Sequence, residues 1–169
     1  MKRKPVLAIL IAAAAIFTSV CAYAAKNDDQ TEIAALEQRI ATAVEAKNAD
    51  AVMANYVPGD SLMVFDMIPP REYDGWNAYK KDWQGVFDLC TSPISMKITD
   101  LKLVSDGKLA VGHSLQHFKC TTAKGDKIAM VMRTTDGYRK SGGKWLIFHE
   151  HNSVPVDLLT GKADMSSKP

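Results

Sequence analysis

The feature that constrains this chain most is a change in the spacing of its apolar residues at Pro93. Before this point apolar side chains recur every three or four residues, as in helices; after it they alternate with polar ones, as in strands. Turn-forming sequences divide the second half into four predicted strands, near residues 94–104, 108–120, 126–139 and 144–154. Helices followed by an antiparallel meander predict an α+β fold whose helices cover one face of the sheet.

The N-terminal half begins with two predicted helices. Apolar residues with helical spacing indicate a long first helix over residues 31–47, and Asp29 with Glu32 resembles a capping pair at its start. Asn48 interrupts the pattern, and a short second helix is expected over residues 49–56. These helices supply an apolar surface that the sheet can bury.

A short strand and a third helix complete the N-terminal half. The strand is predicted over residues 62–65 and ends at Asp66, and two prolines make the following loop, residues 67–71, extended. Asp74 is a favourable N-cap for the third helix. An aromatic stripe on that helix must be buried over the concave sheet, either as core or as the wall of a ligand pocket. It consists of Trp76, Tyr79, Trp83, Val86 and Phe87.

The first 24 residues have the layout of a secretory signal peptide. A basic start, an apolar run that ends at Val20 and an Ala22-Tyr23-Ala24 cleavage site follow one another, and the run is shorter than the roughly 20 residues of a membrane-spanning helix. Lipoprotein processing at Cys21 is an alternative, although Val20 stands where that signal normally has a small residue. We therefore expect a periplasmic or secreted protein with a domain over residues 25–157 and a flexible polar tail over residues 158–169.

The charge argues against polyanionic partners. The net charge of the chain is +2, but three of its cations and none of its anions lie in the signal peptide, so the remainder carries −1. Without a basic block, neither nucleic acid nor an anionic membrane is an expected partner of the mature protein. No glycine-rich loop opens a helix in the manner of a phosphate-binding loop, and no cofactor is predicted.

Two cysteines, Cys90 and Cys120, remain after removal of the signal peptide, and an oxidising compartment favours a disulfide between them. If Ser105 faces Lys108 across the first hairpin, Cys120 lies opposite Pro93 and close to Cys90 at the end of the third helix. The alternative is a pair of neighbouring free thiols.

Several local sequences resemble the SnoaL-like and nuclear-transport-factor-2-like superfamily, which shares the ketosteroid-isomerase-like fold. They are residues 65–70 (FDMIPP), 79–83 (YKKDW) and 133–135 (RTT), and above all 143–157 (GKWLIFHEHNSVPVD). The resemblance implies a cone-shaped domain with three helices on a curved sheet, a pocket for a small-molecule ligand at its wide end, and a homodimer formed through the outer face of the sheet. It does not fix a reaction, because this fold serves many functions.

The resemblance also implies a role for Asp66. Ketosteroid-isomerase-like and SnoaL-like enzymes keep at this position the carboxylate that moves a proton beside a carbonyl, whereas the alternative is an Asp that caps the proline-rich loop. The position of the tyrosine that stabilises the oxyanion in ketosteroid isomerase is occupied by Ile40, which cannot donate a hydrogen bond. Steroid isomerisation by that mechanism is therefore not expected, and an oxyanion would need another donor.

The last predicted strand supplies further candidates. Strict alternation places His149, His151 and Ser153 on one face with Trp145 and Ile147, as in a pocket wall graded from apolar to polar. His149 and His151 are candidate catalytic groups, and Ser153 and Trp145 are candidate ligand-binding groups.

His113 on the second long strand can come near Arg133 on the third, and Arg133 could hold a carboxylate or carbonyl. Alternatively, Arg133 forms a structural ion pair with Glu150 or Asp66. A shift of one residue in the turn at 141–143 decides whether Arg133 shares a face with the two histidines of the last strand. The same histidines with His113 and an acid could bind a metal, but nothing shows that a third ligand converges, and no metal site is predicted.

Two functions remain open at this level. One is an exported binding protein whose pocket holds a small, partly apolar molecule without turnover. The other is a cofactor-independent isomerase, dehydratase or cyclase with Asp66 as general base, assisted by the histidines or by Arg133.

Overall fold

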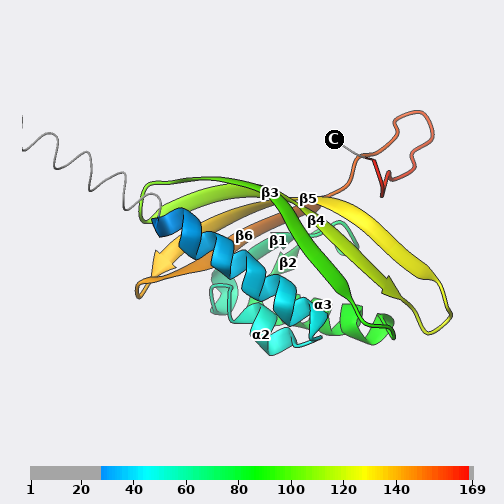
Figure 1. Cartoon of the computed structure of the whole chain (residues 1–169), viewed down its shortest axis with the longest axis horizontal. Coiled ribbons are helices and arrows are strands. Elements are labelled where there is room, and N and C mark those ends of the chain that lie inside the picture. Colours follow the sequence, from blue (N-terminus) through cyan, green and yellow to red (C-terminus); the bar gives the residue numbers. More distant parts are fainter. Residues whose placement is uncertain (1–27, 168–169) are drawn as a thin grey trace, which may run out of the picture.

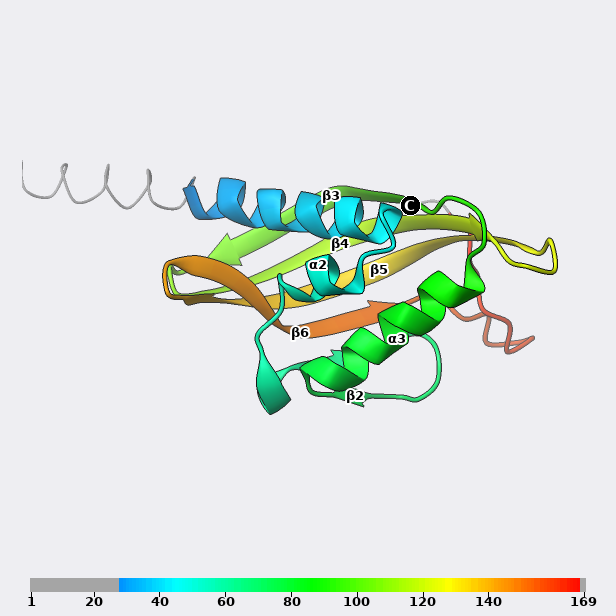
Figure 2. The same ribbon diagram turned by 90° about the horizontal axis from the view of Figure 1, so that it is seen from below.

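The computed structural model describes residues 28–167 and confirms the α+β fold. Helices lie on one side of a curved, open, six-stranded sheet whose strand order is β2-β1-β6-β5-β4-β3 (Figures 1 and 2). The long strands are β3 (Ser95–Ser105), β4 (Leu109–Thr121), β5 (Lys127–Ser141) and β6 (Lys144–Ser153). They form the predicted antiparallel meander, with boundaries within two residues of those expected.

Strand registers differ from the predicted ones in both hairpins. Ser105 pairs with Ala110 rather than with Lys108, and a bulge between Thr99 and Lys102 shifts the rest of the β3–β4 ladder. In the next hairpin His113 pairs with Thr135 rather than with Arg133, and the two residues are diagonal neighbours on one face of the sheet. Both turns are longer than the glycine positions alone indicate.

The short strand β1 (Met63–Phe65) joins the N-terminal half to the meander because it pairs in parallel with β6, opposite residues 149–151. Strand β2 (Tyr73–Asp74) then pairs with β1 at the sheet edge. Asp66 follows β1 directly, and the pairing therefore brings it beside the C-terminal part of β6.

The N-terminal helix, described over residues 28–45, buries Ile33, Leu36, Ile40 and Val44 against the sheet. Asp29 lies inside this helix and does not form the expected capping pair. Its buried carboxylate accepts hydrogen bonds from the Ser105 hydroxyl at 2.8 Å, the Lys140 ammonium at 3.1 Å and the Trp145 indole at 3.3 Å. Asp29 therefore fastens the helix to three strands.

The two shorter helices are the 3₁₀ turn η1 (Gly59–Ser61) and α2 (Ala49–Met53), which Asn48 caps by accepting from the amide of Ala51. The third predicted helix, α3 (Trp76–Leu89), does not use Asp74 as its N-cap. Asp74 belongs to β2, and Gly75, with φ +85°, makes the turn into the helix. A glycine is favoured there because few other residues adopt that φ.

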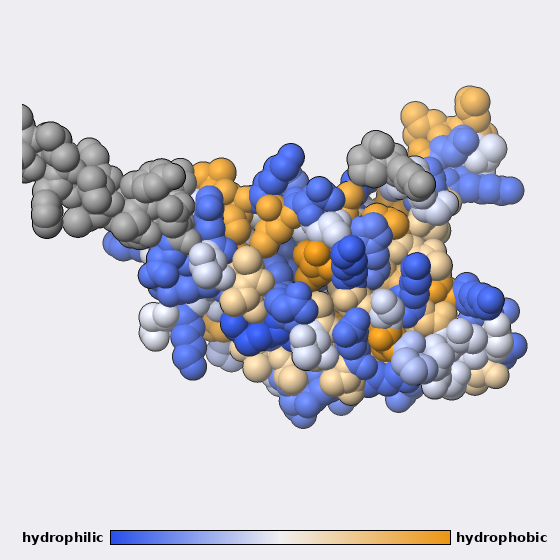
Figure 3. Space-filling view, viewed as in Figure 1, coloured by the Kyte–Doolittle hydropathy of each residue, from blue (hydrophilic) through white to orange (hydrophobic). Residues whose placement is uncertain are grey.

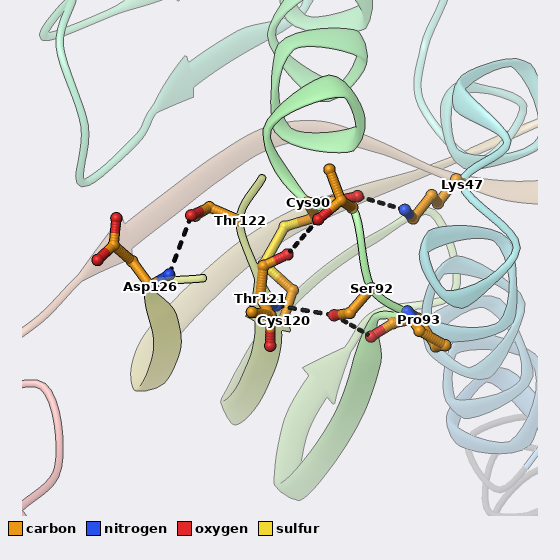
Figure 4. Close-up of a disulfide and its surroundings, with 9 residues drawn as sticks. Lys47, Cys90, Ser92, Pro93, Cys120, Thr121, Thr122 and Asp126 are labelled. Atoms are coloured by element: carbon orange, nitrogen blue, oxygen red, sulfur yellow. Dashed lines mark hydrogen bonds between the residues drawn. A yellow bond between two sulfur atoms is a disulfide. The ribbon is translucent and has the colours of Figure 1, made fainter. Parts of the chain in front are cut away.

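The predicted disulfide is present between Cys90, just after α3, and Cys120 on β4, with Cα atoms 5.7 Å apart (Figure 4). Neighbouring bonds hold the same junction: the amides of Thr91 and Ser92 donate to the Thr121 carbonyl, and the Lys47 ammonium donates to the Cys90 carbonyl. The end of α3 is thereby fixed to the sheet and to the turn that follows the N-terminal helix.

Hydrogen bonds tie the last described residues to each other and to β5. Asp164 donates from its amide to Pro155, and Val131 donates to Met165. Figure 3 shows apolar side chains on this projecting turn, where Leu158 and Leu159 are 94% and 98% exposed.

The predicted signal peptide, its cleavage site and Cys21 lie outside the described residues. Within residues 28–167, no helix is long and apolar enough to cross a bilayer.

Candidate functional site

A cavity lies between the helices and the concave face of the sheet, with an empty space of about 650 Å³ that includes its open mouth. Its lining combines an apolar wall with several acids and hydroxyl or amide groups. The apolar part comprises Ile40, Met67, Ile68, Trp83, Val86, Phe118, Met130 and Met132, and the polar part Glu37, Tyr56, Asp66, Tyr79, Asp82, Gln116, Glu150 and Asn152.

A β-bulge in β6 decides which residues of that strand reach the cavity. Gly137 of β5 pairs with His149, but the next residue, Tyr138, pairs with Ile147, so Phe148 is the extra residue. Alternation therefore breaks at Phe148: Trp145 and Ile147 point inward before it, and Glu150 and Asn152 after it. Gly137 leaves room for the bulge, since a Cβ there would lie 2.8 Å from the Phe148 ring.

The prediction that His149, His151 and Ser153 share a face with Trp145 and Ile147 is therefore wrong. The structure places all three on the outer face, where the two imidazoles lie edge-on to the Phe65 ring at 5.6 and 5.8 Å. His149 also contacts the Met63 carbonyl through Nδ1 at 3.1 Å. None of these side chains lines the cavity.

Arg133 and His113 are exposed on the same outer face, and their places exclude a direct role inside the cavity. Two predicted ligand-binding aromatics also have other partners: the Trp76 indole donates to the Met53 carbonyl at 2.9 Å, and that of Trp145 donates to Asp29. Of the predicted site residues, the cavity brings together Asp66, Tyr79 and Trp83.

Glu150 occupies the centre of a buried hydrogen-bond network. The hydroxyls of Tyr56 and Tyr79 each donate to one of its oxygens, and the Asn152 amide donates to it at 2.7 Å. Asn152 in turn accepts from the Thr134 hydroxyl at 2.7 Å. Burial and the nearby Glu150 charge raise the pKa of both tyrosines well above its usual range, so both hydroxyls remain donors.

A second buried group joins the N-terminal helix to β5. The Tyr138 hydroxyl lies 2.7 Å from Glu37 and 3.3 Å from Asp136, and one oxygen of each acid has no hydrogen-bond partner. Burial raises the pKa of Glu37 to about 7, with Glu150 adding to the effect, and raises the pKa of Asp136 well above its usual range. A single hydroxyl proton cannot satisfy two buried carboxylates, so the uncharged form of an acid is favoured here.

Asp66 is half-buried at the cavity wall, where its carboxylate accepts from the Met67 amide at 2.7 Å. Burial, together with the nearby charges of Glu150 and Asp82, raises the pKa of Asp66 to about 7. Hydrogen bonds from Met67 and Asn152 lower this pKa and partly offset the rise. Asp82 also has a raised pKa because of burial, although hydrogen bonds from Tyr73 and Asp66 oppose the rise. The Tyr73 hydroxyl donates to Asp82 at 2.7 Å. Asp66 can therefore gain or lose a proton near neutral pH.

Positive charge is missing from this site. Among the described residues, the lining holds four carboxyl groups and no lysine, arginine or histidine. No three His, Cys, Asp or Glu side chains within residues 28–167 are arranged to share a metal ion. The imidazoles considered for such a site face away from Asp66 and Glu150.

These observations define a small α+β domain with a cavity between its helices and its sheet. Residues 33–157 match the family of SnoaL-like domains, and the chain belongs to that family. No curated protein matches the chain.

Among solved structures, a nuclear transport factor 2-like protein of unknown function from Pseudomonas putida KT2440 is 32% identical, with a TM-score of 0.74 over 85% of this chain and 98% of its own. A protein from Streptomyces avermitilis provisionally named a dehydratase is 11% identical, with a TM-score of 0.67 over 76% and 97%. One from Novosphingobium aromaticivorans DSM 12444, provisionally named a scytalone dehydratase, is 15% identical, with a TM-score of 0.68 over 76% and 85%. At these identities the latter two show the shared fold alone.

Sequence reasoning missed most of the polar lining, including Glu37, Asp82, Glu150 and Asn152. One available signal was Gly137 in the middle of a long strand, because an isolated strand glycine often marks a bulge. Another was Glu37 among the apolar positions Ile33, Leu36 and Ile40, since an acid on a buried helix face needs a partner.

Proposed function

We propose that this protein binds a small, partly apolar molecule in the cavity between its helices and sheet. The observation that carries the proposal is the lining itself, in which apolar side chains surround a few fixed polar groups. Ligand sites of proteins typically have this composition, because the apolar walls supply affinity and the polar groups fix orientation.

The hydrogen bonds among the polar groups support a preformed site. Glu150 is held by Tyr56 and Tyr79 from the helical side and by Asn152 from its own strand. A ligand entering such a site does not have to order these groups, which lowers the cost of binding.

Thermal-shift and calorimetric titration with two uncharged bicyclic probes, 2-indanol and 2-indanone, test this proposal. Binding to the folded state raises the melting temperature. Val86→Trp on α3 and Met130→Trp on β5 fill the cavity from opposite walls, and each is expected to abolish binding while the far-ultraviolet circular dichroism stays unchanged. Arg133→Ala on the outer face is the matched control and should leave binding intact. Equal binding by wild type and by both cavity-filling variants would refute the proposal.

A second function, proton transfer without a cofactor, is favoured by Asp66. A carboxyl whose pKa is about 7 is suited to take a proton from carbon beside a carbonyl and to return it. The Trp83 indole N–H is a buried donor without a partner, and Trp83 also lines the cavity. It is a candidate for the hydrogen bond to a developing oxyanion that the apolar Ile40 cannot provide. An isomerase, dehydratase or cyclase would use this chemistry.

Exchange of the α-protons of 2-indanone in deuterium oxide, followed by proton NMR, tests this second function. Wild type should exceed the buffer rate, and Asp66→Asn should reduce the enhancement by about 100-fold or more, in line with the loss of a general base. Arg133→Ala should retain it. If 2-indanone binds but its α-protons exchange no faster than in buffer, the protein binds this ketone without catalysing proton transfer from it.

We also propose that the protein works outside the cytoplasm. The predicted signal peptide and the disulfide agree with an oxidising compartment. Expression of the full chain, followed by fractionation and intact-mass measurement, should recover a periplasmic or secreted species that begins near Ala25. A full-length cytoplasmic product would contradict export.

A further inference from the structure

The cavity has a surplus of acceptors that the protein itself does not satisfy. Its four carboxyl groups come from four elements: the N-terminal helix (Glu37), the end of β1 (Asp66), α3 (Asp82) and β6 (Glu150). The surrounding hydroxyls and the Asn152 amide already donate to these acids. Among the described residues that line the site, none carries a positive charge.

Glu37 identifies where that donor is needed. Its side chain is 2% exposed and lines the cavity, and one of its carboxylate oxygens has no hydrogen-bond partner. The groups facing it are Tyr138 and Asp136 from β5 and Glu150 from β6. None of these is a cation, so a charged Glu37 has the Tyr138 hydrogen bond but no counter-charge unless the ligand brings one.

The rest of the wall fits the body of such a ligand. Tyr79 and Trp83 present aromatic rings whose centroids are 6.0 Å apart, and Met67, Met130 and Met132 add polarisable apolar surface. Aromatic faces attract cations, and an alkylammonium group offers three donors to nearby carboxylates. A carboxylate-bearing ligand would instead meet four acids and no compensating charge.

We propose that the ligand of this cavity is a small apolar amine, bound as its ammonium ion with Glu37 as the principal counter-charge. This inference rests on the proposed small-molecule site and narrows the class of its ligand. It replaces the expectation that Arg133 would select a carboxylate or carbonyl, because Arg133 lies outside the cavity.

Binding of the ammonium ion is coupled to release of protons. In the empty cavity, burial keeps the pKa of Glu37 and of Asp66 near 7, so both acids are partly protonated at neutral pH. A bound cation favours their charged forms and lowers both pKa values. Affinity for the amine therefore increases as the pH rises from 5.5 to 8, a range in which an alkylamine stays protonated.

Three probes with one apolar body test the inference: 2-aminoindane, 2-indanol and indane-2-carboxylate, titrated calorimetrically into the wild-type protein at pH 8. We expect the amine to bind at least tenfold more tightly than the alcohol and the carboxylate not to bind detectably. Titrations near pH 7 in phosphate and in Tris should differ in apparent enthalpy, as net proton release requires.

Glu37→Gln should reduce the preference for amine over alcohol at least fivefold. Asp88→Asn, which removes the same charge from the exposed side of α3, should leave that preference unchanged. Alcohol binding equal to or tighter than amine binding, abolished by Val86→Trp, would overturn the cation preference and leave the cavity proposal standing. An amine preference that persists in Glu37→Gln would overturn the assignment of the counter-charge. No binding by any probe would contradict both proposals.

Discussion

The buried Glu37 makes a quantitative prediction about stability and pH. In the unfolded chain a glutamate ionises near 4.5, whereas in the folded protein the pKa of Glu37 is raised to about 7. Between these two values the unfolded state binds fewer protons than the folded state, so this residue makes stability fall as the pH rises, until the fall ends above pH 7.

The size of this effect follows from the difference between the two pKa values. One unit corresponds to about 1.4 kcal/mol, and between pH 5 and pH 8 the residue should lower the free energy of unfolding by between about 2 and 3 kcal/mol. Glu37→Gln keeps the shape of the side chain and removes the titration. From pH 5 to pH 8, the free energy of unfolding of Glu37→Gln should therefore rise relative to that of wild type by about 2 to 3 kcal/mol.

Urea denaturation of both proteins at pH 5 and pH 8 measures this shift. Asp106→Asn is a contrasting variant, because the amides of Leu109 and Lys108 lower the pKa of the exposed Asp106. Asp106→Asn should change the pH dependence of stability only at acidic pH, where the wild type loses the stabilising contribution of charged Asp106 as the pH falls. A Glu37→Gln curve parallel to that of wild type from pH 5 to pH 8 would refute the burial argument for Glu37.

Three further predictions concern the scaffold. Replacing Cys90 and Cys120 by serine opens a loop with a sequence separation of 30 and should cost about 4 kcal/mol in urea denaturation under non-reducing conditions; an unchanged midpoint would show that the bridge adds no stability. Gly137→Ala should cost about 1 to 3 kcal/mol because its Cβ meets the Phe148 ring, whereas Gly85→Ala, whose Cβ meets nothing within 4 Å, should be neutral or stabilising; equal effects would argue against the bulge. If the protein is a homodimer through the outer face of its sheet, that face includes the paired residues Val104 and Val111, which are 70% and 59% exposed. Val104→Asp and Val111→Asp should then give a monomer in sedimentation velocity, whereas Leu159→Asp should leave the dimer intact. A monomeric wild-type protein would exclude the dimer.

Much of the fold could be predicted because its signals are local. The alternation after Pro93 and the glycine turns define the four long strands to within two residues, and the cysteine pairing follows from any register near the observed one. The start of the third helix was misplaced because Asp74 is a good N-cap by residue type, whereas the chain uses the positive φ of Gly75 and pairs Asp74 with Met63. Cap preference is weaker than a tertiary pairing that the sequence does not display.

The site was harder to predict because one residue inverts a strand face. Asp66, Tyr79 and Trp83 were found, since they precede the bulge or lie on other elements. The extra residue at Phe148 moves Glu150 and Asn152 inward and the two neighbouring histidines outward. A prediction that assumes strict alternation along a strand does not detect an inserted residue. Its consequence here is a site expected to contain imidazoles and a guanidinium, whereas the observed site contains carboxyl groups.

The central claim, that the cavity binds a small molecule, is tested most directly by methyl NMR of the wild-type protein labelled at methionine. Met67, Met130 and Met132 line the cavity, whereas Met63 lies on the outer face and Met165 in the C-terminal turn. Titration with 2-aminoindane should shift the three cavity methyl signals together with a single affinity and leave the other two in place. Shifts confined to Met63 or Met165, or none at all, would contradict the claim.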